Sequence, residues 1–125
     1  MAFPSDAREA ASLVAEARRV LPVGAQSSLT GGATPRGDLV ISTRALTHIS
    51  RPSPDTIRVG AGVPLFDVQR VLAADDRYYP PVPTYDGAFV GGTISTNAAS
   101  TLSSRGALGV LNGQSSGSAG RPSCA

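Results

Sequence analysis

The sequence predicts a small α+β domain, built from two amphipathic helices and several short strands. Apolar residues recur at helical spacing in residues 6–20 and again after Pro64. Between these two segments, the compact apolar run at residues 39–41 is typical of a short buried strand, and residues 56–59 are interpreted as another strand. A chain of 125 residues is long enough to bury one modest core and too short for a second large domain.

The first helix is expected over residues 6–20. Asp6 and Glu9 have the spacing of a capping box, which satisfies free N–H groups at the start of a helix. Pro22 would end this helix. Its inner face would carry five apolar residues, Leu13, Val14, Ala17, Val20 and Leu21.

Short strands and a second helix follow in order. Residues 21–24 are expected to form a strand that leads into a glycine-rich loop, and residues 39–41 and 56–59 form two more. Residues 60–62 read Gly-Ala-Gly and predict a turn. Pro64 then fits the first turn of a helix, whose buried face would consist of Leu65, Val68, Val71 and Leu72.

Residues 24–35, GAQSSLTGGATP, form the most informative loop of the chain. They contain three glycines, four hydroxyl side chains and no charge. Glycine leaves the backbone accessible, successive exposed amides bind anions, and hydroxyls donate to phosphate oxygens. Taken alone, the loop fits either a diphosphate site or an ordinary surface turn.

A second polar stretch favours the diphosphate site. Residues 78–99, YYPPVPTYDGAFVGGTISTNAA, are nearly uncharged and carry a glycine pair followed by hydroxyl and amide side chains. Residues 80–83 are expected to be stiff and extended, because each proline fixes its own φ and restricts its neighbour. Two such loops could hold one extended ligand from two directions.

Together the two stretches resemble the FAD-binding (PCMH-type) domain of the vanillyl-alcohol oxidase and p-cresol methylhydroxylase flavoproteins. Within that family they look most like FAD-linked oxidases related to glycolate oxidase and D-lactate dehydrogenase. Residues 22–33, PVGAQSSLTGGA, resemble the loop that wraps the FAD diphosphate, and residues 91–99, GGTISTNAA, resemble a later segment that returns to the cofactor. The resemblance covers residues 4–99. It implies the small α/β subdomain of a PCMH-type FAD-binding fold, incomplete at its C-terminal end.

The resemblance also implies a function. Family members use FAD to take a hydride from a carbon beside an alcohol, hydroxy-acid or phenol oxygen, and this N-terminal part grips the diphosphate and part of the flavin. The small-molecule substrate and most catalytic groups belong to a later domain, so no catalytic residue is expected here. The residues expected to contact FAD are Gly24, Ala25, Gln26, Ser27, Ser28 and Leu29, with Gly31 and Gly32 as turn formers, and Gly92, Thr93, Ser95, Thr96 and Asn97.

Several positions depart from the family pattern. Many relatives carry glycine where Gln26 and Ser28 stand. Some attach FAD covalently through a histidine near the position of Gln26, so non-covalent FAD is expected here. His48 is interpreted as a half-buried polar residue of a connector. Three aromatic residues either line the flavin edge or pack the domain: Tyr78, Tyr79 and Tyr85.

Residues 100–125 have a different composition. Fifteen of these 26 residues are Gly, Ser or Ala, and none is acidic or aromatic. Such a segment buries too little apolar surface to offset its ordering entropy, so a disordered tail is expected. The FAD-binding part would then comprise residues 4–99, and a truncated or frame-shifted gene product is one interpretation of the change.

Composition argues against several other classes. Residues 1–99 contain nine Arg and nine Asp plus Glu, a balance unlike that of a nucleic-acid-binding stripe. The one cysteine, Cys124, cannot form an internal disulfide or a metal cluster. No apolar run approaches a membrane span, and a cytoplasmic location is expected because the chain does not open on a basic-then-apolar leader. The first loop also lacks the lysine of a P-loop and the glycine spacing of a Rossmann site.

The favoured function is therefore binding of FAD as part of an FAD-linked oxidoreductase that acts on a hydroxy acid or alcohol. Two alternatives stay open. The chain could be a truncated, catalytically inactive remnant, or it could be a stand-alone nucleotide-binding module.

Overall fold

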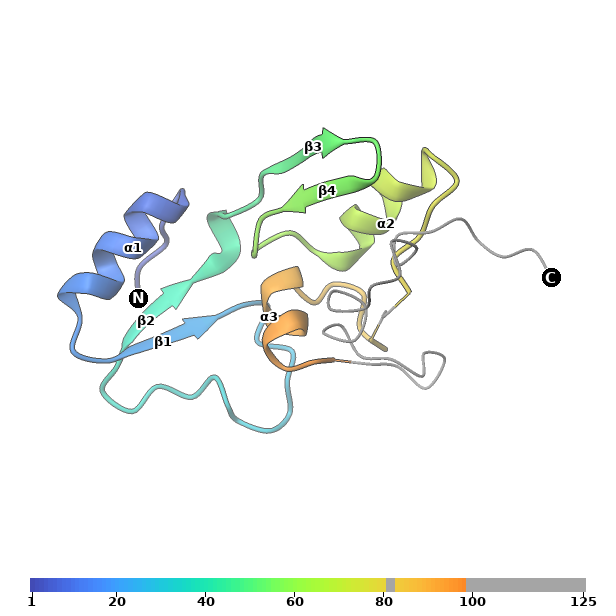
Figure 1. Cartoon of the computed structure of the whole chain (residues 1–125). Coiled ribbons are helices and arrows are strands. Elements are labelled where there is room, and N and C mark those ends of the chain that lie inside the picture. Colours follow the sequence, from blue (N-terminus) through green and yellow to red (C-terminus); the bar gives the residue numbers. More distant parts are fainter. Residues whose placement is uncertain (81–82, 99–125) are drawn as a thin grey trace.

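A parallel strand pair with a helix beside it adjoins an antiparallel hairpin that has its own helix (Figure 1). The computed structural model describes residues 1–80 and 83–98. This arrangement confirms the predicted α+β class. In chain order the elements are α1 (Ala7–Glu16), β1 (Val20–Val23), β2 (Leu39–Ser42), the 3₁₀ turn η1 (Thr43–Ala45), β3 (Ile49–Ser53), β4 (Thr56–Val59), α2 (Leu65–Ala73) and α3 (Val90–Ser95).

Helix α1 begins where the capping pattern predicts. The Asp6 side chain accepts a hydrogen bond from the Glu9 N–H (2.8 Å). The Glu9 carboxylate accepts from both the N–H and the hydroxyl of Ser5 (2.7 and 2.9 Å). The two side chains therefore satisfy N–H groups at the helix start, as a capping box does, with Ser5 in place of the cap residue's own N–H.

The same helix ends earlier than predicted. Ala17 is already extended, so α1 ends at Glu16 rather than near residue 20. Val20 instead pairs with Leu39, whose N–H donates to the Arg19 carbonyl (3.0 Å). The predicted helix length is wrong because pairing with a distant strand takes precedence over local helical periodicity.

Strands β1 and β2 are parallel, in a register that runs from Val20 opposite Leu39 to Val23 opposite Ser42. The strands predicted at residues 21–24 and 39–41 are thus confirmed to within one residue. The chain passes from the end of β1 to the start of β2 through residues 24–38. The glycine-rich loop therefore leaves the carboxyl end of β1.

The core lies between α2 and the β3–β4 hairpin. Strand β4 and helix α2 occupy their predicted places, with Pro64 as the N-cap residue directly before α2. Strand β3 has no counterpart in the prediction, since its sequence ISRPS shows neither alternation nor an apolar run. The buried residues Val63, Val68 and Leu72 pack with Ile49, Ile57, Val59, Tyr79 and Val90.

The second glycine stretch contains a short helix, not the continuous loop that the sequence predicts. Helix α3 begins after Phe89, which pairs with Pro64 in an isolated bridge. The Val90 N–H donates to the Val63 carbonyl and the Gly91 N–H to the Ala61 carbonyl, both at 2.9 Å. The prediction was wrong because glycine is a weak helix former, whereas these long-range bonds fix the start of α3.

None of the helices in the described ranges has the length and apolar character that a membrane crossing requires. In the same part of the chain, no group of His, Cys, Asp and Glu is arranged to hold a metal.

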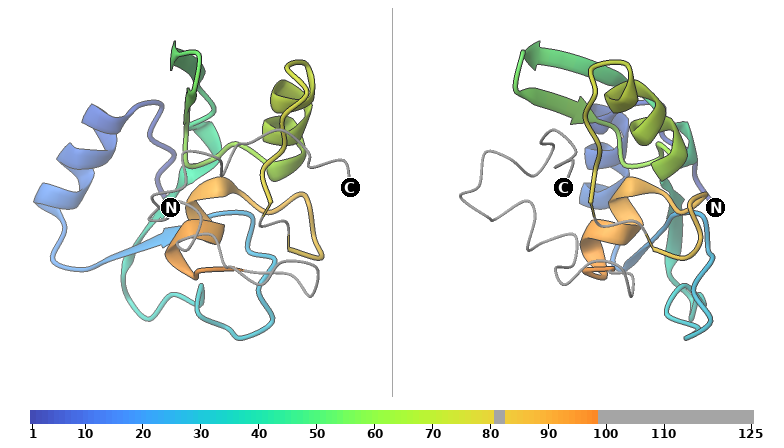
Figure 2. Two further views of the ribbon diagram at one scale, coloured as in Figure 1. Left: turned by 45° about the vertical axis from the view of Figure 1, so that its right-hand side comes forward. Right: turned by 90° about the vertical axis from the view of Figure 1, so that its right-hand side faces the viewer.

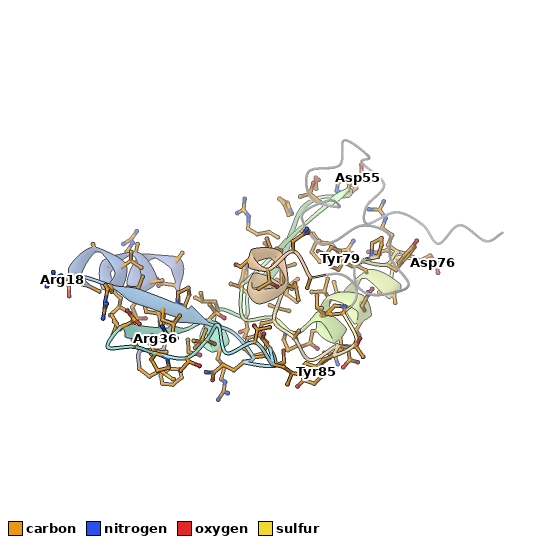
Figure 3. All side chains as sticks on the ribbon, turned by 90° about the horizontal axis from the view of Figure 1, so that it is seen from below. Arg18, Arg36, Asp55, Asp76, Tyr79 and Tyr85 are labelled. Atoms are coloured by element: carbon orange, nitrogen blue, oxygen red, sulfur yellow. The ribbon has the colours of Figure 1, made fainter. Side chains whose placement is uncertain are left out.

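Figure 3 shows Arg18 and Arg36 near the α1 end and Asp55 and Asp76 at the opposite end. The predicted tail at residues 100–125 and residues 81–82 of the proline-rich stretch lie outside the described residues.

Candidate functional site

A cavity of about 430 Å³ lies where β1 ends, between the glycine-rich loop and α3. Figures 1 and 2 show α3 beside the carboxyl end of β1 from three directions. The cavity brings together ten of the residues that the sequence assigns to FAD: Gly24, Ala25, Gln26, Ser27, Ser28, Gly32, Gly92, Thr93, Ser95 and Thr96. Two segments that are far apart in the sequence thus line one space.

Three assigned residues do not line this cavity. Leu29 is fully exposed, at 102% of its reference area. Gly31 has a φ of 71°, a left-handed value that suits its predicted role as a turn former. Asn97 follows α3 with a φ of 49°. Cofactor contact by Leu29 and Asn97 stays a prediction.

The cavity also includes residues that the sequence did not assign. Thr30, Ala33 and Gly91 lie inside the two motifs, and Ala88 and Phe89 directly precede the second. Pro22 and Val23 are the first two residues of the first motif. No motif marks Thr43 and Ala61, because they come close only through the fold.

The inner wall is built by close approach of backbone to backbone. A Cβ on Gly62 would lie 1.9 Å from the Thr43 carbonyl oxygen, and a Cβ on Gly60 would lie 2.1 Å from that of Leu46. The N–H groups of these glycines donate to Leu46 and His48 (3.0 and 2.8 Å). The Gly-Ala-Gly turn therefore needs both glycines, and it presents Ala61 to the cavity.

Gly92 forms the open part of the α3 wall. A Cβ at this position would have no heavy atom within 4 Å, although Gly92 lines the cavity. The neighbouring Gly91 is tightly packed, since its Cβ would lie 2.7 Å from the Ala61 Cβ. A side chain at residue 92 would thus occupy space that a ligand could use, without disturbing the protein around it.

The glycine-rich loop carries free backbone donors, four of them on residues that line the cavity. Within the described part of the chain, the N–H groups of residues 25–29 make no hydrogen bond. Gln26 has a left-handed φ of 54°, which is uncommon for a residue other than glycine. Gln26 stands where many relatives carry glycine, which adopts such a φ at little cost. Clustered free N–H groups in turns bind anions, so this wall fits a diphosphate.

The hydroxyls of α3 contribute less than their number suggests. Thr93, Ser95 and Thr96 donate to the carbonyls of Val90, Gly91 and Gly92 at 2.8–2.9 Å. A hydroxyl has one proton, so in this conformation these three groups can accept from a ligand but cannot donate to it. Donation is left to the loop, where Ser27, Ser28 and Thr30 reach the cavity.

None of the lining residues in the described ranges is charged. The cavity also holds none of the three tyrosines and not His48. His48 is exposed, which corrects the expectation that it is half-buried. Tyr79 packs against the core, whereas Tyr78 and Tyr85 are 41% and 57% exposed.

Tyr79 carries the clearest electrostatic perturbation. Burial raises the pKa of its phenol above the ordinary value, because a buried phenolate loses its hydration. Its hydroxyl is buried and has no hydrogen-bond partner in the part of the chain that the structure describes. The side chain therefore has a packing role outside the cavity.

Comparison with known proteins identifies the family of the chain. Residues 1–110 match the family model described as "FAD binding domain". A D-lactate dehydrogenase of Archaeoglobus fulgidus is 32% identical over 101 residues, which cover 76% of this chain and 23% of that protein. The chain thus spans less than a quarter of that relative's length.

Solved structures show the same fold. Two structures of cholesterol oxidase from Brevibacterium sterolicum, one a histidine-to-alanine variant, align with TM-scores of 0.64 and 0.63 at 17% identity. Each alignment covers 77% of this chain and 20% of the oxidase. At this identity the likeness concerns the fold alone. Given the family match over residues 1–110, the chain belongs to the FAD-binding domain family of FAD-linked oxidoreductases.

Proposed function

We propose that the cavity between the glycine-rich loop and α3 holds FAD, with the diphosphate against the N–H groups of residues 25–29. The observation that carries this proposal is the convergence of both motifs on one space of about 430 Å³. The open face of Gly92 supports it, because the fold leaves room there for a ligand. Bound FAD would supply the redox chemistry, while the protein positions it.

We propose further that FAD is held without a covalent bond. Within the described ranges, the residues that line the cavity include no histidine, cysteine or tyrosine, and Gln26 has no nucleophilic atom suited to linkage. Acid precipitation of FAD-loaded protein should therefore release all of the flavin into the supernatant. Flavin that stays with the precipitate would contradict this part of the proposal.

The substrate class that we propose is a hydroxy acid or alcohol, oxidised by the complete protein of which this chain forms the FAD-binding part. The support is the 32% identity to a D-lactate dehydrogenase. In the complete FAD-loaded protein, loss of flavin absorbance on anaerobic addition of D-lactate or another hydroxy acid would support this proposal. Absorbance left unchanged by every hydroxy acid and alcohol tried would contradict it. A cytoplasmic location is part of the proposal and is checked by cell fractionation.

The binding proposal is tested by titrating FAD with the protein and following the quenching of flavin fluorescence. Gly92→Leu should abolish saturable binding, because the new side chain fills the cavity. Ala11→Leu is the control, since it places the same leucine side chain on the exposed surface of α1 and should leave binding unchanged. Equal binding by both variants would contradict the proposal. Absent binding in a chain without a cooperative melt would favour an inactive remnant, and equally tight binding of ATP would favour a general nucleotide-binding module.

A further inference from the structure

Residues 27–30, three of which line the cavity, form a separate unit that is here called the tip. The hydroxyls of Ser28 and Thr30 share a hydrogen bond of 2.8 Å, and the Thr30 N–H donates to the Ser28 hydroxyl (3.3 Å). Among residues 1–80 and 83–98, no hydrogen bond joins the tip to the rest of the chain. The tip thus holds its own shape and is attached by its two ends alone.

Both ends of the tip adjoin a residue in the left-handed region. Gln26, directly before it, has a φ of 54°, and Gly31, directly after it, has a φ of 71°. Glycine adopts other φ values at little cost, and glutamine gains by leaving the left-handed region. A rotation at these two residues would move the tip without deforming it.

The chain on either side of the tip is fixed. Val23 is paired in β1, and the Thr34 N–H donates to the Gly31 carbonyl (3.1 Å). Farther along, the Arg19 side chain binds the Asp38 carboxylate (3.1 Å) and the Arg36 carbonyl (2.7 Å). Motion of the loop is therefore confined to the residues between Val23 and Gly31, which include the tip.

Leu29 is the one tip residue that does not line the cavity. Ser27, Ser28 and Thr30 line it, whereas the Leu29 side chain is 102% exposed. Water disfavours an aliphatic side chain with no apolar neighbour. Closure of the tip over a bound ligand would give Leu29 the contact that it lacks.

We propose that the tip is a flap that closes over the bound dinucleotide, turning at Gln26 and Gly31 and burying Leu29 against the ligand. This inference rests on the proposed function, and it adds a movement through which Leu29, exposed in this structure, would reach the ligand. Leu29 contributes nothing to the packing of the open protein. A substitution of Leu29 should thus change the affinity for the ligand and leave the stability of the ligand-free protein unchanged.

Leu29→Ser tests the contribution to affinity. It should weaken FAD binding by about tenfold, the effect of losing one partly buried leucine, and it should leave the melting temperature of the ligand-free protein unchanged. Val14→Ser is the control, because Val14 is a half-exposed aliphatic residue on α1 outside the cavity. Its affinity for FAD should stay at the parent value. An unchanged affinity for Leu29→Ser would overturn the flap.

Leu29→Trp tests the movement directly, since the chain contains no tryptophan. On saturation with FAD, acrylamide quenching of the tryptophan lifetime should fall severalfold. The same measurement on Phe66→Trp, at an exposed position of α2, should show no such fall. A tryptophan at residue 29 that stays fully accessible while ultrafiltration shows bound FAD would overturn the flap and leave the proposed function intact. Absence of bound FAD in the parent protein would instead overturn the proposed function, and the flap with it.

Discussion

Gly91 lies directly on Ala61: its N–H donates to the Ala61 carbonyl at 2.9 Å, and a Cβ on Gly91 would lie 2.7 Å from the Ala61 Cβ. This contact joins the start of α3 to the turn that precedes α2. It also positions one wall of the cavity, because Ala61, Gly91 and Gly92 all line it. Gly91 and Gly92 therefore have different roles: Gly91 packs against Ala61, and Gly92 leaves space in the cavity.

Gly91→Ala should destabilise the protein, whereas Gly92→Ala should not. The new methyl at residue 91 meets Ala61 at 2.7 Å, and such overpacking costs about 1–3 kcal/mol. The methyl at residue 92 meets nothing within 4 Å, and alanine in a helix gains up to about 1 kcal/mol over glycine. Urea unfolding gives the free energy of unfolding of each variant. Equal values would show that the Gly91–Ala61 contact does not limit the size of residue 91.

Gln69→Leu should lower the free energy of unfolding by about 1–3 kcal/mol. The Gln69 carboxamide donates to the Tyr79 carbonyl (2.6 Å) and accepts from the Tyr79 N–H (2.9 Å), so leucine leaves both backbone groups without a partner. Arg70→Leu, next in sequence, removes only an exposed ion pair with Asp67, worth at most about 1 kcal/mol. Thermal melts show which variant loses more stability, and Gln69→Leu should melt at the lower temperature. A lower melting temperature for Arg70→Leu would contradict the importance given to the Gln69–Tyr79 hydrogen bonds.

Tyr79→Phe should keep or raise stability at neutral pH, by up to about 2 kcal/mol, because it removes a buried hydroxyl that lacks a partner. The pKa of this phenol is raised in the folded state, so the unfolded state ionises first as pH rises. Below the unfolded-state pKa of about 10, the phenol is neutral in both states and its ionisation does not change the free energy of unfolding. Above that pH, ionisation in the unfolded state lowers the free energy of unfolding. Between neutral and alkaline pH, the free energy of unfolding should thus fall less steeply for Tyr79→Phe than for the exposed Tyr85→Phe, as measured by denaturant unfolding at each pH. Parallel curves would contradict a buried Tyr79 phenol.

FAD binding should depend only weakly on ionic strength. The lining residues within residues 1–80 and 83–98 are all uncharged, so the diphosphate would be held by N–H groups and hydroxyls rather than by ion pairs. Salt screens interactions between fixed charges and has little to screen here. Titrations at low and high salt check this, and a steep loss of affinity with salt would point to arginines outside this cavity.

Much of this fold follows from local patterns. The Asp6–Glu9 spacing predicts the start of α1, and the apolar run at residues 39–41 predicts β2. The elements that local patterns miss are held by distant partners. Strand β3 forms because Ile49 pairs with Val59, and α3 forms despite two glycines because residues 61–63 bind its first turn.

In the candidate site, too, some residues can be predicted from local sequence patterns and others come together only through distant contacts. The loop residues Gly24 to Ser28 are recognisable from their composition, since free amides and hydroxyls suit a diphosphate. Thr43 and Ala61 line the cavity but belong to no motif, because the Gly60 and Gly62 contacts bring them there. Leu29 shows the opposite case, in which a motif residue faces solvent.

The most direct test of the FAD site is a map of backbone amide chemical shifts during an FAD titration of the ¹⁵N-labelled protein. We expect saturable shifts at Gly24–Ser28 and at Gly92–Thr96, which form the two cavity walls, and no change along β3 and β4. Shifts confined to other segments, or unchanged amides in both walls at saturating FAD, would contradict the account.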